Sequence, residues 1–260
     1  MSYLEEYYTR YDEEGRLLSR HGQVEYLTTM KYIRRCLSEL HEPRILEVGA
    51  GTGRYSVTLA KQGFSVTAVE LVPHNLEVLE AKLDGSEPIT VIRGNALDLS
   101  SLPDGAFDLT LLLGPMYHLY TREDQLQALA EAVRATRSGG YILAAYCMNE
   151  PTVIQYVFGS NHLREVLEKD MLTPDWHCKS EPKEIFELVR TEDIAALDAA
   201  FPVERIRLVA ADGATNYHRE AVDAMDEETF GKWMEYHFAT CERQDLIGAS
   251  HHTLDILRKR

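Results

Sequence analysis

The stretch Ile45–Ser56, ILEVGAGTGRYS, places an apolar run containing Glu47 directly before Gly49, Gly51 and Gly53. The apolar run predicts a short buried strand, because strands covered on both faces are nearly continuous in apolar residues. Alternate glycines let the backbone turn sharply and approach a ligand closely, and the next helix presents its N-terminal amides there. The stretch therefore predicts a strand, a ligand-binding loop and a helix.

Short apolar segments alternate with amphipathic helical segments on both sides of this loop. We expect strands at 44–49, 64–71, 89–95, 107–114, 141–147, 203–212 and 250–259. Helices are expected before the first strand and between the later ones, including one at 123–137 that is ended by Gly139 and Gly140. This alternation predicts an α/β fold with a doubly wound, mostly parallel seven-stranded sheet. Helical insertions are expected after the fifth strand and between the sixth and seventh strands.

Two common phosphate-binding loops do not fit the glycine pattern. A dinucleotide fingerprint, GxGxxG, needs its third glycine at position 54, where Arg54 stands. A P-loop ends in Lys followed by Ser or Thr, and GAGTGRYS has no such ending. The loop instead resembles the first motif of the class I S-adenosylmethionine (SAM)-dependent methyltransferases, which is an acid followed by GxGxG.

The resemblance extends from about Arg44 to Cys147. Glu70 ends the second expected strand, GNALDL follows the third, and FDLTLLLGPMYHL matches the fourth-strand motif. The sequence departs from the family at Asn95, where an acid is common. An adenine contact there would use the amide oxygen or move to the backbone of Ala96.

The resemblance implies SAM as the cofactor, with S-adenosylhomocysteine (SAH) as product. Glu47 would orient the cofactor's ammonium group, and the Glu70 carboxylate would accept both ribose hydroxyls. The implied cofactor-binding residues in the core are Glu47, Gly49, Ala50, Gly51, Gly53, Glu70, Leu71, Asn95, Ala96, Leu113 and Gly114.

The resemblance also suggests a division of the single domain, 1–260. Residues 1–42 would form an N-terminal helical lid, 43–148 the SAM-binding core, and 149–189 and 213–245 a helical substrate cover. In the lid, Tyr11 and Arg16 are expected cofactor contacts, with Tyr8 and His21 as further candidates. In the cover, His162, Trp176, Tyr217 and His237 are expected to face the acceptor.

Methyl transfer from a sulfonium needs chiefly a nucleophile held in line and protected from water, a proximity effect of up to about 7–11 kcal/mol. Tyr117 and His118, which follow the turn at Gly114 and Pro115, are the candidate catalytic residues. Histidine can take a proton near neutral pH, and tyrosine can hydrogen-bond or stack on a cation. No metal is expected. The acceptor nucleophile, oxygen, nitrogen or carbon, stays open.

Composition limits the partners. With 27 basic and 42 acidic residues the formal charge is −15, which disfavours nucleic acid and leaves a small-molecule acceptor as the expected partner. The sequence has no long apolar run, and its four cysteines form no CxxC pair, so we expect a cytoplasmic protein without membrane association. Two alternatives remain: a non-catalytic SAM-binding module and an NAD(P)-dependent Rossmann dehydrogenase.

Overall fold

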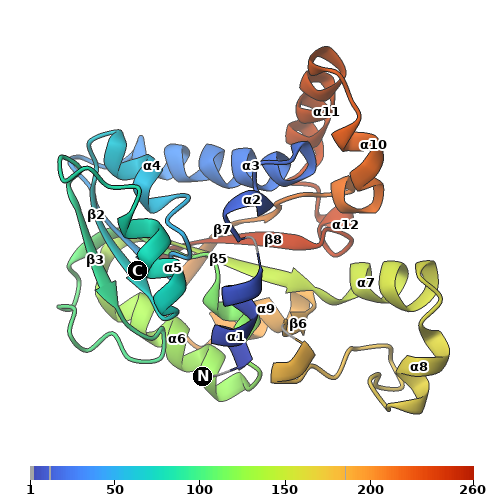
Figure 1. Ribbon diagram of the computed structural model, residues 1–260. Helices are drawn as coiled ribbons and strands as arrows, with labels where there is room; N and C mark the ends of the chain where they lie inside the picture. The colour runs from blue at the N-terminus through green and yellow to red at the C-terminus, as the bar shows by residue number, and fades with distance from the viewer. Residues whose placement is uncertain (1–2, 12, 185) are drawn as a thin grey trace.

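The computed structural model describes residues 3–11, 13–184 and 186–260, and its centre is one eight-stranded sheet (Figure 1). The strands are β1 (Arg44–Val48), β2 (Ser65–Glu70), β3 (Ile89–Arg93), β4 (Phe107–Leu112), β5 (Thr136–Met148), β6 (Leu188–Val189), β7 (Val203–Ala210) and β8 (His252–Lys259). Their order is β3-β2-β1-β4-β5-β8-β7, with β6 paired to β5. The pairs from β3 to β5 are parallel, whereas β8 is antiparallel to β5 and to β7.

Helices flank this sheet and fill the connections. They include α1 (Tyr3–Arg10), α2 (Glu13–Arg16), α3 (Arg20–Leu37), α4 (Ser56–Lys61), α5 (Pro73–Glu80), α6 (Arg122–Ala135), α7 (Asn149–Thr152), α8 (Leu163–Glu168), α9 (Thr191–Asp198), α10 (Arg219–Asp223), α11 (Glu227–Thr240) and α12 (Gln244–Ile247). Shorter helical turns are η1 (Pro115–His118), the π-helix η2 (Val153–Gly159), η3 (Pro182–Glu184) and η4 (Thr215–His218). In Figure 1, α3 and α4 lie on one side of the sheet and α6 and α9 on the other. This confirms the doubly wound fold.

Two details of the sequence prediction were wrong. The sheet has an eighth strand, β6, whose two residues pair with the end of β5 and are too few to give a periodic signal. The glycines expected to end α6 lie inside β5, and α6 itself ends at Ala135. The strand begins at Thr136, whose buried hydroxyl bonds both the Thr110 hydroxyl and the Ala132 carbonyl, so this side chain joins helix and sheet.

The central strands carry the apolar core. Leu46 and Leu109 on neighbouring strands are fully buried, as are Leu143 and Leu257 further along the sheet. Because β1 to β5 run parallel, the loops after their carboxyl ends gather along one edge, where open α/β sheets bind ligands. Of the helices that the described ranges contain, none is long and apolar enough to cross a membrane.

The two expected insertions project from the sheet in different directions. The first holds α7, η2 and α8, and the second holds η4, α10 and α11 (Figure 1). The second insertion contacts α3 through α10, η4 and α11. Helix α1 lies over the carboxyl edge, where it contacts α5 and η3. Segments far apart in the sequence therefore meet at the ligand edge of the sheet.

Candidate functional site

The glycine loop after β1 is fastened to the end of β2. The amides of Gly49 and Ala50 donate to the Val69 carbonyl at 2.8 and 3.0 Å. Gly49 and Gly51 have φ values of +73° and +55°, a left-handed conformation that side chains with a Cβ rarely adopt. A Cβ on Gly49 would also lie 2.6 Å from Cδ of Pro115. Glycine is therefore required both by the turn and by the close approach of η1.

Glu70, at the end of β2, is held by backbone amides. Its Oε2 accepts from Gly51 N at 2.7 Å and its Oε1 from Val72 N at 2.8 Å. Burial raises the pKa of this carboxyl, although the hydrogen bonds from Val72 and Gly51 oppose the shift. The contacts fix the carboxylate beside the glycine loop.

Glu47 on β1 is a buried carboxyl with no lysine or arginine partner among the described residues. Its side chain accepts a hydrogen bond from the Ser56 hydroxyl and is 1% exposed. Burial raises the pKa of Glu47 to about 8, with partial opposition from the Ser56 hydrogen bonds. Among residues 3–11, 13–184 and 186–260, no lysine or arginine lies within 4 Å of it. The Glu47 carboxylate can therefore form an ion pair with a cationic group of a ligand.

These loops enclose a pocket with about 1050 Å³ of empty space, part of it open to solvent, which we call the first pocket. Most of the predicted cofactor residues line it. They are Glu47, Gly49, Ala50, Gly51, Glu70, Leu71, Asn95, Ala96, Leu113, Gly114 and Arg16. The side-chain oxygen of Asn95 already accepts from Leu97 N at 3.0 Å, which leaves its amide nitrogen as the uncommitted end.

Gly53 and Tyr11 do not line the first pocket. A Cβ on Gly53 would lie 2.6 Å from Cγ of Leu79 and 2.9 Å from Cγ2 of Val57, and its φ is +81°. This glycine therefore allows close packing of the loop against α4 and α5 instead of approach to a ligand. Tyr11 lies on the other side of the N-terminal segment, where its ring stacks on Tyr7 at a centroid distance of 5.0 Å.

A second pocket, with about 710 Å³ of empty space, adjoins the first. Tyr8, Arg16 and Tyr117 line both pockets and form the junction between them. The second pocket is otherwise lined by Tyr7, Tyr11, His21, Gly22, Glu25, Phe186, Asn216, Arg219 and His252. Two compartments thus meet at three side chains, an arrangement suited to two ligands that must touch.

Tyr117 lies at this junction, and His118 lines only the first pocket, with its ring against Tyr117 at a centroid distance of 4.9 Å. The Tyr117 hydroxyl donates to the Leu113 carbonyl at 2.8 Å, and burial raises its pKa, so the phenol stays neutral. His118 Nε2 lies 2.8 Å from the Tyr8 hydroxyl, which joins η1 to α1. Phe186 packs near both rings, with a centroid distance of 5.5 Å to each.

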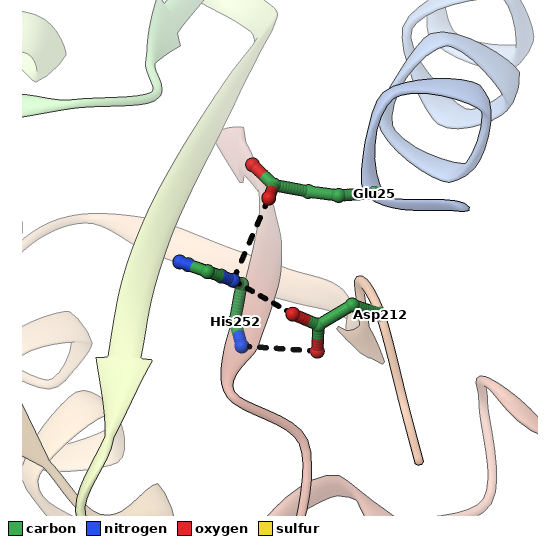
Figure 2. A group of neighbouring side chains, drawn as sticks. All are labelled: Glu25, Asp212 and His252. Carbon is green, nitrogen blue, oxygen red and sulfur yellow. Dashed lines mark hydrogen bonds and ion pairs between the residues drawn. The ribbon is translucent and has the colours of Figure 1, made fainter. Parts of the chain in front are cut away.

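Sequence reasoning missed a polar cluster beside the second pocket, formed by Glu25, Asp212 and His252 (Figure 2). His252 Nδ1 lies 2.7 Å from Asp212 Oδ2 and 3.5 Å from Glu25 Oε2. Burial lowers the pKa of His252, but Glu25, Cys147 and Asp212 outweigh it and raise the pKa well above its usual value. The imidazole is therefore charged at neutral pH. The residues lie on α3, after β7 and on β8, so no local motif marks them.

The three side chains are close enough to hold a metal ion, with ligand atoms within 4.8 Å of one another. Each carboxylate already has strong donors, however. Arg16 donates to both oxygens of Glu25, at 2.8 and 3.2 Å, and the Asn216 amide donates to Asp212. A cation would have to displace a guanidinium and an imidazolium, so we assign no metal to this cluster.

The insertion side chains expected to face the acceptor lie elsewhere. His162 stacks on Tyr156, and Trp176 is exposed beside Phe158. Tyr217 and His237 line a separate pocket, where the His237 ring also bonds the Thr28 hydroxyl. None of the four lines the first or second pocket. The insertions contribute Phe186, Asn216 and Arg219 instead.

Known proteins match the part of the chain that builds the first pocket. Residues 46–144 match the family model described as "Methyltransferase domain". YqeM of Bacillus subtilis, which carries the name of a methyltransferase, is 29% identical over 134 residues, 51% of this chain and 51% of YqeM. The chain therefore spans about half the length of this relative.

A second relative and one solved structure extend the likeness. The ubiquinone biosynthesis O-methyltransferase of Methylocella silvestris is 29% identical over 183 residues, 70% of this chain and 68% of its own. A SAM-dependent methyltransferase of Thermotoga maritima shares the fold with a TM-score of 0.59 and 18% identity, over 99% of both chains. Residues 46–144 thus match a methyltransferase domain, and the chain has the fold of SAM-dependent methyltransferases, a family whose cofactor is SAM.

Proposed function

We propose that this protein transfers a methyl group from SAM in the first pocket to a small molecule in the second. The observation that carries the proposal is the shared wall of the two pockets, formed by Tyr8, Arg16 and Tyr117. One pocket is built by the glycine loop of the methyltransferase domain, and the other opens from it at the methyl-transfer end.

The side chains of the first pocket suit SAM. Glu47 is a buried carboxyl without a basic side chain within 4 Å in the described ranges, and it would pair with the ammonium group. Glu70 is fixed by two amides and retains acceptor capacity for ribose hydroxyls. Asn95, Ala96 and Leu97 line the end where adenine would lie. When bound, SAM supplies an electrophilic methyl carbon, and the chain supplies position and shelter from water.

The catalytic contribution that we propose for Tyr117 and His118 is positional. The Tyr117 hydroxyl is committed to a backbone carbonyl, so its ring borders the junction and limits how an acceptor can enter. His118 holds Tyr8 of the N-terminal segment across the pocket. Proximity and exclusion of water would then account for most of the rate enhancement.

We further propose that residues 1–42 form a lid and that the two insertions form the acceptor side. The lid contributes Leu4, Tyr8, Arg16 and Leu17 to the first pocket, and the insertions contribute three residues to the second. The four cysteines are free thiols, which suits the cytoplasm, and the charge of −15 disfavours nucleic acid as substrate.

Methyl-labelled SAM incubated with a metabolite library, and assayed for SAH, tests the proposal. An enzyme forms SAH only when a suitable acceptor is present. A non-catalytic binding module binds SAM, measured by calorimetry, and forms no SAH with any acceptor. A dehydrogenase is protected from thermal unfolding by NAD(P) and not by SAM. Either of the last two outcomes would overturn the proposal.

A further inference from the structure

The cations that line the second pocket differ in their partners. Arg16 forms a two-pronged pair with Glu25, and His252 pairs with Asp212 (Figure 2). Arg219 also lines the pocket, but no carboxylate of the described residues lies within 4 Å of it. Its Nε donates to the Asn216 side-chain oxygen at 2.6 Å. The two terminal nitrogens of Arg219 form no ion pair with any described residue, so they are free to bind an anion in this pocket.

Asn216 and Asp212 set the position of Arg219 relative to His252. The Asn216 amide nitrogen donates to Asp212 Oδ2, which also accepts from His252 Nδ1 at 2.7 Å. Because Nδ1 faces the two carboxylates, the other ring nitrogen, Nε2, lies on the opposite edge of the imidazole (Figure 2). None of the side-chain hydrogen bonds formed by the described residues uses Nε2 of His252. Two donors with positive charge therefore border one compartment.

The other walls of this pocket are aromatic. Tyr7, Tyr8, Tyr11, Tyr117 and Phe186 line it. The Tyr117 and His252 rings have a centroid distance of 6.5 Å, so a flat molecule about one ring wide would reach from the junction to the cationic side. His21, which also lines the second pocket, has its Nδ1 atom 2.7 Å from Oδ2 of Asp223, so this carboxylate already has a partner.

We infer that the second pocket takes a small aromatic carboxylic acid, with its carboxylate held by Arg219 and His252 and its nucleophile directed to the junction. This inference rests on the proposed function, because it assumes that the methyl group is transferred at the junction of the two pockets. A carboxylate would pair with the one lining arginine that has no acidic partner among the described residues, and a planar anion matches the guanidinium fork. An amine would meet Arg219 and the His252 imidazolium and would have to compete with Arg16 for Glu25.

Binding of non-reacting probes to the full chain tests this assignment. Benzoate, benzamide, benzylamine and phenyl phosphate are titrated by calorimetry, with and without saturating SAH. Benzoate is expected to bind about tenfold or more tightly than benzamide, because only the acid forms charge-assisted hydrogen bonds. Benzylamine is expected to bind more weakly than benzamide. Equal binding of benzoate and benzamide, tighter binding of benzylamine, or binding of phenyl phosphate without benzoate would overturn the inference.

Three arginine variants, two at Arg219 and one control at Arg164, locate the anion. Arg219→Gln is expected to lower benzoate affinity about tenfold, Arg219→Lys less, and Arg164→Gln, at an exposed position on α8 outside both pockets, not at all. SAH affinity should stay within about twofold in all three, because the sites are separate. Unchanged benzoate affinity in Arg219→Gln would refute the site. Failure of the wild-type protein to bind SAH would refute the proposed function alone, since the benzoate titration without SAH still decides the inference.

Discussion

The two pockets adjoin, but the chain assembles them in opposite ways. The first is built mainly by short stretches after β1, β2, β3 and β4, which parallel pairing brings to one edge. The second takes one to three residues each from α1, α2, α3, η1, η4, α10 and β8, together with Tyr11 and Phe186 from connecting segments. A pocket made by consecutive residues at strand ends leaves a motif in the sequence, whereas a pocket made by distant single residues leaves none.

The largest effect that separates the pockets is expected at the glycine loop. Gly51→Val places a branched side chain at a φ of +55°, beside the amide that holds Glu70. The turn should open, and SAH affinity measured by calorimetry should fall by about 100-fold or more. Gly63→Val, at a φ of +92° with nothing within 4 Å, is the control for strain alone. Normal SAH affinity in a folded Gly51→Val protein would disprove the role of the loop.

Glu70→Ala is expected to cause the next largest loss of SAH affinity. Loss of charge-assisted bonds to the ribose should weaken SAH binding by about 1.5–3 kcal/mol, roughly 10- to 150-fold. The substitution also removes the acceptor for Gly51 N and Val72 N, so a melting curve must accompany each titration. If affinity is unchanged, the ribose is held by other residues.

The pH dependence of SAH binding tests Glu47. Burial raises its folded pKa to about 8 from 4.5, so without ligand the folded state binds the extra proton and stability falls as pH rises between those values. An ammonium group beside Glu47 favours the carboxylate, so SAH binding should release a proton. The affinity for SAH should therefore rise about tenfold for each unit of pH increase, as long as the pH is below the raised pKa of Glu47. Calorimetry at pH 7 in buffers of different ionisation enthalpy measures this release. The same release in Glu47→Gln would exclude Glu47 as its source.

The smallest expected effect belongs to the second pocket. Phe186→Ala removes an aromatic wall that contacts Tyr117 and His118. The value of kcat/KM for the acceptor should fall about 3- to 10-fold, as expected for lost aromatic contacts, with SAH affinity unchanged. Phe158→Ala, at a 53% exposed position on η2, is the matched control and should leave both quantities unchanged. Parallel loss of SAH affinity in Phe186→Ala would remove the distinction between the pockets.

The same difference explains what the sequence could predict. The strand pattern predicted the sheet, and residues at or directly after strand ends, such as Glu70 and Leu113, line the first pocket. Gly53 lies in the same motif but packs against Leu79, because a glycine pattern does not tell ligand approach from helix packing. His252 and Asp212 are brought together only when β7 and β8 pair, and their partner Glu25 lies more than 180 residues earlier. The histidines and aromatic residues of the insertions were predicted from residue type alone, and residue type does not tell which pocket a side chain faces.

Helix α1 has a consequence for the order of events in turnover. Tyr8 borders both compartments, Leu4 only the first, and Tyr7 and Tyr11 only the second. The helix is tied to the insertion side by the Tyr3 hydroxyl on the Lys183 carbonyl and to η1 by the bond between Tyr8 and His118. A displacement large enough to admit the cofactor would break these ties and uncover the acceptor as well. Under the proposed function, the exchange of SAH for SAM and the exchange of methylated product for fresh acceptor would therefore use the same opening.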